Sequence, residues 1–308
     1  MDAQETFRDI FAVFNYLKMQ GWSGMALTSP HFEVMDMGND ELCAVPMPMQ
    51  PLYRGQSRYY EICQPTLHRK QWTREALFER ELQLADFALI LNKHPEIKER
   101  IEAGLKINYL GLAQHYGIPT DILDFTNSPL VAAFFATTTY NAETDTYSPI
   151  LHAISKGIIY FVPDGGLFDN MIPDCSRMLP VGMEALHRPG EQRAYGRKMK
   201  NDEDLNNTAG VLKFFFWHTP DASMKIWRIC NGAHGFFPYD PMAHKVRNIK
   251  RYRIYSEDAL QEALNKMPDF AKDITGARDI MTSLGAKIVD FIPFAYTEDE
   301  LDYIRRNN

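Results

Sequence analysis

The stretch that decides the fold is residues 112–136, which read LAQHYGIPTDILDFTNSPLVAAFFA. It joins the polar end of one helix to a Gly-x-Pro turn, a short alternating segment and the apolar beginning of another helix. Asn127 or Ser128 stands before Pro129, which is typical of a capping residue followed by proline at the first helical position. The stretch therefore predicts a helix, a turn, a strand and a second helix in quick succession.

Helical periodicity marks several further segments. Their apolar residues recur every three or four positions, and a capping residue or a glycine stands at one end of most of them. We expect these helices over residues 5–19, 73–93 and about 95–116 (in one piece or two), and again after Ser256 and Thr297.

Strands are expected mainly later in the chain, where apolar and β-branched residues gather in short runs. The expected strands are residues 52–55 (ending in a turn), 158–162, 213–217 and 225–229, and residues 43–51 are expected to be an extended connector. Because helices come first and strands later, without β-α-β alternation, the sequence predicts the α+β class.

The composition narrows the possible functions. The 308 residues are enough for a sizeable core, and 45% hydrophobic with 24% charged residues is ordinary for a globular protein. A net charge of −7 argues against a broad phosphate-binding surface, although it leaves a local basic groove open. The N-terminus lacks a signal-peptide pattern, the longest apolar run is too short for a bilayer, and the four cysteines form no C-x-x-C pair. We therefore expect a cytoplasmic protein with reduced thiols and no membrane partner.

Arg54 is the first candidate for a binding side chain, because it stands between Tyr53 and Gly55. A guanidinium offers planar, forked donors that suit a phosphate or a pyrophosphate. Gly55 would let a ligand approach the backbone closely. The alternative is a surface or ion-paired arginine beside a turn glycine.

A second group of candidates lies in residues 114–126. His115 either interacts with the C-terminus of its helix or contacts a ligand, where it could act as a general base. In extended geometry Asp124 and Thr126 share one face, where they either line a pocket or brace a turn. The spacing of His115, Asp121 and Asp124 fits no recognised ligand pattern, so no metal site is expected.

Three groups of residues together resemble the FRG domain family: Tyr53-Arg54-Gly55, residues 114–120, and Leu123-Asp124-x-Thr126-x-Ser128-Pro129. Weaker likenesses at residues 187–196 and 231–240 extend the resemblance to roughly residues 50–255. The outline of that family is similar to the ADP-ribosyltransferase fold. The resemblance implies an α+β split β-sandwich of ADP-ribosyltransferase-like type over residues 46–255, with helical additions at residues 1–45 and 256–308.

The same resemblance implies NAD as a co-substrate and ADP-ribosyl transfer to a protein or nucleic-acid acceptor, or NAD hydrolysis. The implied catalytic residues are Arg54, Asp124, Thr126, Glu191 and Gln192. The implied NAD-binding residues are Tyr53, Gly55, Gln56, Gln114, His115, Thr120 and Ser128. Such a protein could serve as a toxin, an effector or a phage-defence component. The acceptor and the oligomeric state stay open.

This sequence departs from the transferase pattern at two places. Asp124 stands where a typical transferase has a hydroxyl, and Gln192 stands where transferases usually supply glutamate, with Glu191 adjacent. Breaking the nicotinamide–ribose bond builds up positive charge that a carboxylate stabilises. If residues 191–192 lie in a strand, only one of the two side chains enters the cleft. These departures leave a second hypothesis open, a non-catalytic module that binds a nucleotide, a nucleic acid or a protein.

Two further segments have structural and functional alternatives. Residues 231–240 are expected to form a turn followed by an apolar anchor. Residues 245–253 carry five basic side chains, which indicate either a solvated face or a contact with a nucleic acid or an acidic partner.

Overall fold

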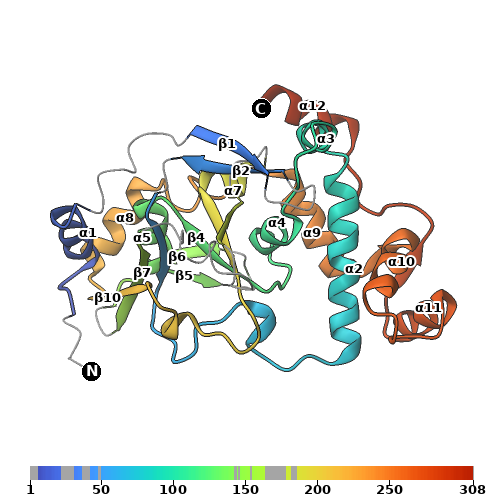
Figure 1. The fold of residues 1–308 in the computed structure, drawn as a ribbon, viewed down its shortest axis with the longest axis horizontal. Helices are drawn as coiled ribbons and strands as arrows, with labels where there is room; N and C mark the ends of the chain where they lie inside the picture. Colours follow the sequence, from blue (N-terminus) through green and yellow to red (C-terminus); the bar gives the residue numbers. More distant parts are fainter. Residues whose placement is uncertain are drawn as a thin grey trace. The chain divides into compact units, whose positions relative to one another are not determined.

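The computed structural model describes residues 6–21, 31–36, 42–47, 50–141, 144, 146–152, 155–163, 178–181 and 186–307 (Figure 1). Residues 31–36, 42–47, 178–180 and 307 are described by their backbone alone. The chain divides into two compact units. The first unit comprises residues 1–35, 44–65 and 121–238, and the second comprises residues 36–43, 66–120 and 239–308.

The first unit is built on a sheet that has six strands among the described residues, in the order β10-β7-β3-β4-β9-β8. Every pair of neighbours is antiparallel. The strands are β3 (Leu52–Gln56), β4 (Ile122–Thr126), β7 (Lys156–Val162), β8 (Met178–Pro180), β9 (Ala194–Lys198) and β10 (Leu212–Trp217). The strands expected at residues 52–55, 158–162 and 213–217 are confirmed, but β3 runs on through Gly55 to Gln56 instead of turning there. The two strands with the strongest motifs, β3 and β4, are therefore central.

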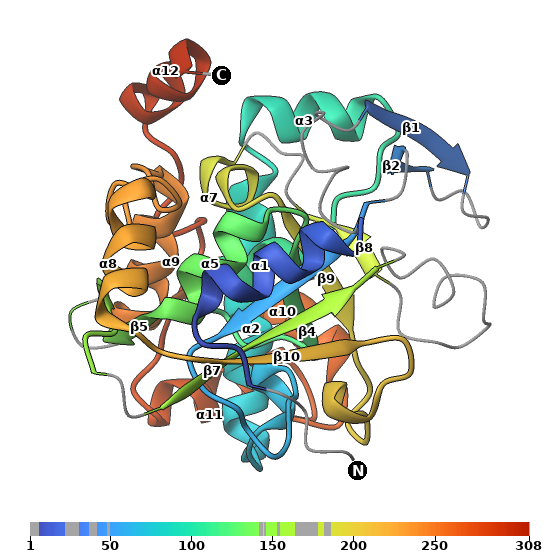
Figure 2. The ribbon, with the colours of Figure 1, turned by 90° about the vertical axis from the view of Figure 1, so that its left-hand side faces the viewer.

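Helices α1 (Ile10–Met19) and α5 (Pro129–Thr137) pack on one face of this sheet, which Figure 2 views from the helix side. We call it the helix face. Tyr53 of β3, Phe161 of β7 and Phe216 of β10 contribute to its core. Helix α8 (Pro220–Ile229) adds its buried residues to the same cluster.

The opposite face of the sheet has its own apolar cluster, and we call it the loop face. Its buried members are Leu52, Cys63, Leu123, Phe125, Ile158, Tyr160, Val162, Tyr195, Met199 and Leu205. The last two come from the segment after β9, which contains the short helix η3 (Leu205–Asn207). Because side chains alternate along a strand, each sheet residue belongs to one of these two faces.

Smaller elements complete the first unit. Strands β5 (Thr138–Asn141) and β6 (Thr146–Pro149) pair with each other. Strands β1 (His31–Asp36) and β2 (Leu42–Met47) also pair, and their residues 31–35 and 44–47 belong to this unit, whereas residues 36, 42 and 43 are assigned to the second. Strand β2 occupies much of the expected connector at residues 43–51. A short helix, α7 (His187–Glu191), precedes β9. Of the cysteines, Cys63 and Cys230 are buried free thiols, and Cys175 lies outside the described residues.

The second unit is mainly helical. Its helices are η2 (Thr66–His68), α2 (Arg74–Leu91), α3 (Pro95–Glu102), α4 (Tyr109–His115), α9 (Pro241–Tyr252), α10 (Glu257–Lys266), α11 (Ile274–Ser283) and α12 (Glu298–Asn307). Strands β11 (Ile254–Ser256) and β12 (Lys287–Val289) form a parallel pair. Helix α2 packs against α4, α9 and α10, and α10 and α11 also pack together.

The expected helices form, although the first begins at Ile10 instead of residue 5, because Phe7 bridges to Phe216 of β10. Thr73, Ser128 and Ser256 accept hydrogen bonds from backbone N–H groups in the first turns of α2, α5 and α10. The helix expected at residues 95–116 forms in two pieces, and Gly117 follows the second piece with φ of +76°. Such a left-handed conformation favours glycine at a helix end. Gly21, with φ of +75°, likewise follows α1.

The strand expected at residues 225–229 is wrong, because these residues end helix α8. Thr219 caps that helix by accepting from the Ala222 N–H, and Pro220 occupies its first turn. The apolar residues of the segment alternate as in a strand, but Thr219 and Pro220 before it indicate the start of a helix. Helices together with an antiparallel sheet confirm a mixed helix–sheet fold. In the described part of the chain, no helix is both long and apolar enough to cross a membrane.

Candidate functional site

The residues of the Tyr53-Arg54-Gly55 motif face opposite sides of the sheet. Tyr53 is completely buried in the cluster on the helix face, where burial raises the pKa of its phenol to about 12. Arg54 alternates to the loop face, together with Leu52 and Gln56. The central residue of the motif therefore has surroundings different from those of its two neighbours.

Gly55 lies directly beneath helix α5. A Cβ placed on Gly55 would lie 2.8 Å from the carbonyl carbon of Ala132 and 2.9 Å from the backbone nitrogen of Ala136, and closer still to the Ala132 carbonyl oxygen. The missing side chain thus lets helix and strand approach each other, and close approach of a ligand is not needed to explain this glycine.

Arg54 is half-buried and is held by strand β4. Its Nη1 donates to the carbonyl oxygen of Asp124 over 2.7 Å. Its Nε is buried and has no hydrogen-bond partner among the described residues. A buried guanidinium donor without a partner is costly unless a ligand or a water accepts its proton. Arg54 is therefore oriented by the fold while one of its donors is left for another group.

Polar residues adjoin Arg54 on the loop face. Arg54 pairs in register with Tyr160 of β7, which pairs in turn with Lys213 of β10. The Tyr160 hydroxyl donates to Asn206 Oδ1 over 2.8 Å, and Lys213 Nζ donates to the Asn206 carbonyl over 2.8 Å. Burial raises the pKa of Tyr160 far above its ordinary value, while the nearby charge of Arg54 acts in the opposite direction. We call Arg54, Tyr160, Asn206 and Lys213 the Arg54 cluster.

Asp124 and Thr126 share one face of β4, as expected, but it is the helix face. Thr126 pairs in register with Tyr53, which lies on the helix face, whereas Leu123 and Phe125, which alternate with Asp124 and Thr126, belong to the cluster on the loop face. Arg54 therefore contacts the backbone of Asp124 and lies across the sheet from its carboxylate.

Thr126 and Gln192 brace the turn that leads into α5. The Thr126 hydroxyl donates to the Gln192 carbonyl over 2.8 Å and accepts from the Ser128 N–H over 3.0 Å. Gln192 is 5% exposed, and its Nε2 donates to the carbonyl of Phe236 over 3.0 Å. Phe236, itself buried, follows the turn at residues 231–235, which agrees with the expected turn and apolar anchor.

Glu191 and Gln192 do not lie in a strand. Glu191 is the last residue of helix α7, Gln192 is its C-cap, and β9 begins only at Ala194. Strand alternation therefore does not apply to this pair. Glu191 is exposed, whereas the side chain of Gln192 is used within the fold.

Three of the candidate NAD-binding residues belong to the second unit. Gln114 and His115 lie in the last turn of α4, and the Thr120 hydroxyl donates to Gln114 Oε1 over 2.8 Å. Thr120 is completely buried, and its carbonyl accepts from the Leu67 N–H. In the first unit, Gln56 Nε2 donates to the Cys63 sulfur over 3.6 Å, and Ser128 caps α5. No group of three side chains suited to a metal ion occurs among the described residues.

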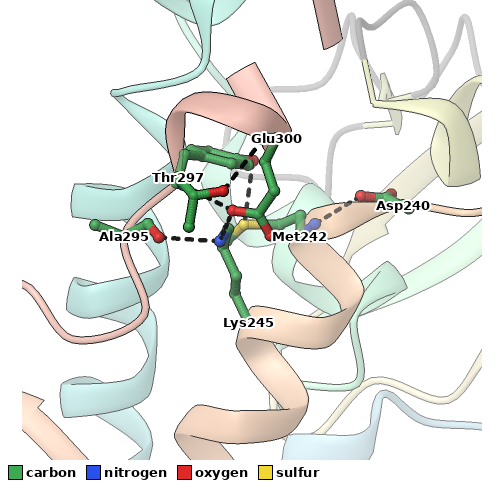
Figure 3. A network of polar contacts seen from close by, with 7 residues as sticks. Asp240, Met242, Lys245, Ala295, Thr297 and Glu300 are labelled. Carbon is green, nitrogen blue, oxygen red and sulfur yellow. Dashed lines mark hydrogen bonds and ion pairs between the residues drawn. The ribbon is translucent and has the colours of Figure 1, made fainter. Parts of the chain in front are cut away.

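The basic stretch at residues 245–253 is not simply a solvated face. Lys245 is 5% exposed, and its Nζ donates to Glu300 Oε2 over 2.6 Å and to the Ala295 carbonyl over 3.0 Å (Figure 3). Arg253 donates from Nε and Nη2 to the carboxylate of Glu79. These two cations hold parts of the second unit together, and Lys245 anchors the segment that leads into α12.

The sequence contains no local sign of the Arg54 cluster. Tyr160, Asn206 and Lys213 come from three separate segments, and only the sheet register and the position of η3 bring them together. Asn206 stands in an Asn-x-Thr sequon, but in the structure its side chain bonds to Tyr160 and to the loop after β3.

The comparison with known families agrees with the motifs. Residues 50–145 match the family model described as the FRG domain. The match includes β3, β4 and α5 of the first unit and α2 to α4 of the second. No curated protein and no solved structure matches the chain.

Proposed function

We propose that the first unit binds NAD with its pyrophosphate at Arg54, and that the protein transfers ADP-ribose from NAD to a macromolecular acceptor or to water. The observation that carries this proposal is the state of the Arg54 side chain. Its Nη1 is fixed on the Asp124 carbonyl, while its buried Nε has no partner among the described residues. A guanidinium held in this way is prepared to receive an anion that has several acceptor oxygens.

The surroundings of Arg54 suit a pyrophosphate. Lys213 adds a second positive charge on the same face, and Tyr160 lies between the two in the sheet register. The NAD molecule would supply the glycosidic bond to nicotinamide that breaks in the reaction. The chain would supply orientation through Arg54 and a carboxylate that stabilises the positive charge formed at the ribose. As part of this proposal, the domain would be a split β-sandwich of ADP-ribosyltransferase type.

Glu191 is our candidate for that carboxylate. Its side chain is exposed, whereas Asp124 lies on the opposite face of the sheet from Arg54, and Gln192 carries no charge. Thr126 and Gln192 would act as positioning residues, because their hydrogen bonds join β4 to α7 and to the turn before Phe236. Such an activity would suit a toxin, an effector or a phage-defence component.

A second candidate function is nucleotide binding without turnover. It is favoured by the use of Thr126 and Gln192 in bracing the fold and by the placement of Asp124 across the sheet from Arg54. Under this alternative, the Arg54 cluster recognises the phosphates and no side chain performs chemistry.

The test is to incubate the purified chain with NAD, with and without cell lysate as a source of acceptor, and to follow nicotinamide release. The variants are Arg54→Ala, Arg54→Lys and Glu191→Gln, and Arg228→Ala on the exposed part of α8 is the control. We expect release by the wild type and by the Arg228 variant, and its loss in Arg54→Ala. Binding of NAD without release would favour the second candidate. If NAD neither binds nor releases nicotinamide, both candidate functions are overturned.

A further inference from the structure

The loop that follows β3 exposes two adjacent aromatic side chains. Tyr59 is 41% exposed and Tyr60 is 42% exposed, although tyrosine rings are often buried in folded proteins. Arg58 places its guanidinium carbon 4.7 Å from the centre of the Tyr60 ring. The loop, residues 57–62, thus presents a cation and two aromatic rings to solvent. We call it the tyrosine loop.

The tyrosine loop is held in place along its length. At its beginning, the Ser57 carbonyl bonds to His218 Nε2 over 2.7 Å, and just beyond its end the Cys63 N–H donates to Asp204 Oδ1 over 2.8 Å. In the middle, Asn206 Nδ2 donates to the carbonyls of Tyr60 and Glu61. A surface segment fixed at so many points presents its side chains with little further loss of conformational entropy on binding.

The same residues connect the tyrosine loop to the Arg54 cluster. Asn206, which holds the backbone of Tyr60, also bonds to Tyr160 and to Lys213. The Tyr59 ring lies 5.5 Å from the ring of Phe215, two residues beyond Lys213 on β10. The Tyr59 ring therefore adjoins the face of the sheet that carries Arg54, and Asn206 ties the backbone of Tyr60 to residues of the same face.

We propose that Tyr59 and Tyr60 form a stacking platform for the purine base of the nucleotide whose phosphates Arg54 holds. Aromatic rings stack on nucleobases, and a cation such as Arg58 over one ring strengthens this kind of contact. Positive charge at Arg54, Lys213 and Arg58 complements the phosphates next to that base. This inference rests on the proposed function, because it assigns the base-binding end of the same nucleotide site.

The test compares two probes by isothermal titration, ADP-ribose and inorganic pyrophosphate, because only the first carries a base. We expect Tyr60→Ala to weaken ADP-ribose binding by about tenfold and to leave pyrophosphate binding unchanged. Tyr60→Trp should retain the affinity and show quenching of its fluorescence when ADP-ribose binds. Tyr140→Ala is the matched control, because Tyr140 is 51% exposed on strand β5 of the same unit.

The outcomes separate the two proposals. If Arg54→Ala abolishes ADP-ribose binding while Tyr59→Ala, Tyr60→Ala and the double variant bind as tightly as the wild type, the stacking platform is overturned and the phosphate site stands. If the wild type binds neither probe, both proposals are overturned. A selective loss for ADP-ribose in the Tyr60 variant, with the Tyr140 variant unaffected, supports both.

Discussion

Replacing Gly55 with alanine should destabilise the first unit severely. The added Cβ would lie 2.8 Å from the carbonyl carbon of Ala132 and 2.9 Å from the nitrogen of Ala136, and its nearest neighbour would be the Ala132 carbonyl oxygen. All three atoms belong to the backbone of α5, so no rotamer change can relieve the contact. Overpacking a core typically costs 1–3 kcal/mol, and this rigid contact should cost about 3 kcal/mol or more.

The assay is thermal and denaturant unfolding of Gly55→Ala beside Gly276→Ala. Gly276 lies in helix α11, where an added Cβ would find its nearest atoms at 3.6 Å, so alanine should be neutral or stabilising there. For a unit of this size, 3 kcal/mol corresponds to a fall in Tm of roughly 6–12 °C. The double variant Gly55→Ala/Ala132→Gly should show no rescue, because the obstructing atoms at Ala132 are backbone atoms. Wild-type stability in Gly55→Ala, or rescue in the double variant, would refute the argument.

Three further predictions concern pH and capping. Burial raises the pKa of Asp86 to about 6 from 3.8, so its contribution to stability is complete below pH 3.8 and is lost as the pH rises through 6. The pKa shift corresponds to about 3 kcal/mol of stability lost at neutral pH, and replacing a carboxylate acceptor costs about 1 kcal/mol. In urea unfolding at pH 7, the Asp86→Asn variant should therefore be about 2 kcal/mol more stable than the wild type. Its free energy of unfolding should stay constant between about pH 4 and 6. Burial alone would raise the pKa of Glu300, but hydrogen bonds from Lys245 and the Thr297 N–H lower it, so this contribution is present above pH 4.5 and is lost as the pH falls further. Glu300→Gln should lower the free energy of unfolding by about 2 kcal/mol and speed proteolysis of the segment before α12. Proteolysis of this variant at the wild-type rate would contradict the anchoring role of Lys245. Ser128→Ala should cost about 1 kcal/mol by removing the cap of α5, as measured by urea unfolding, and Ser128→Thr should restore most of it.

Capping and turn positions could be predicted because the responsible groups are close together in the sequence. Ser128 and Thr297 each bond to an N–H three residues later, and Gly117 relieves a strained conformation at its own position. Such contacts depend on a few consecutive residues, which a single sequence displays in full.

The orientation of the site residues could not be predicted, because it depends on long-range pairing. Arg54 and Asp124 are 70 positions apart, and only the register of β3 with β4 shows that Arg54 binds the carbonyl of Asp124 and lies across the sheet from its carboxylate. Gln192 resembled a strand residue because β9 begins two positions later. Its role in joining β4 to Phe236 depends on contacts 66 and 44 positions away.

The proposed NAD site requires the Arg54 Nε–H to donate a hydrogen bond to a phosphate oxygen of the bound nucleotide. The most direct test is an NMR titration that follows the Nε–H resonances of ¹⁵N-arginine-labelled protein as NAD is added, with the Arg54 resonance assigned by its disappearance in Arg54→Lys. We predict that this resonance shifts progressively and saturates with NAD, while that of Arg228 stays in place. An Arg54 resonance that does not move at saturating NAD would contradict the account. A titration in which NAD does not bind at all would also contradict it.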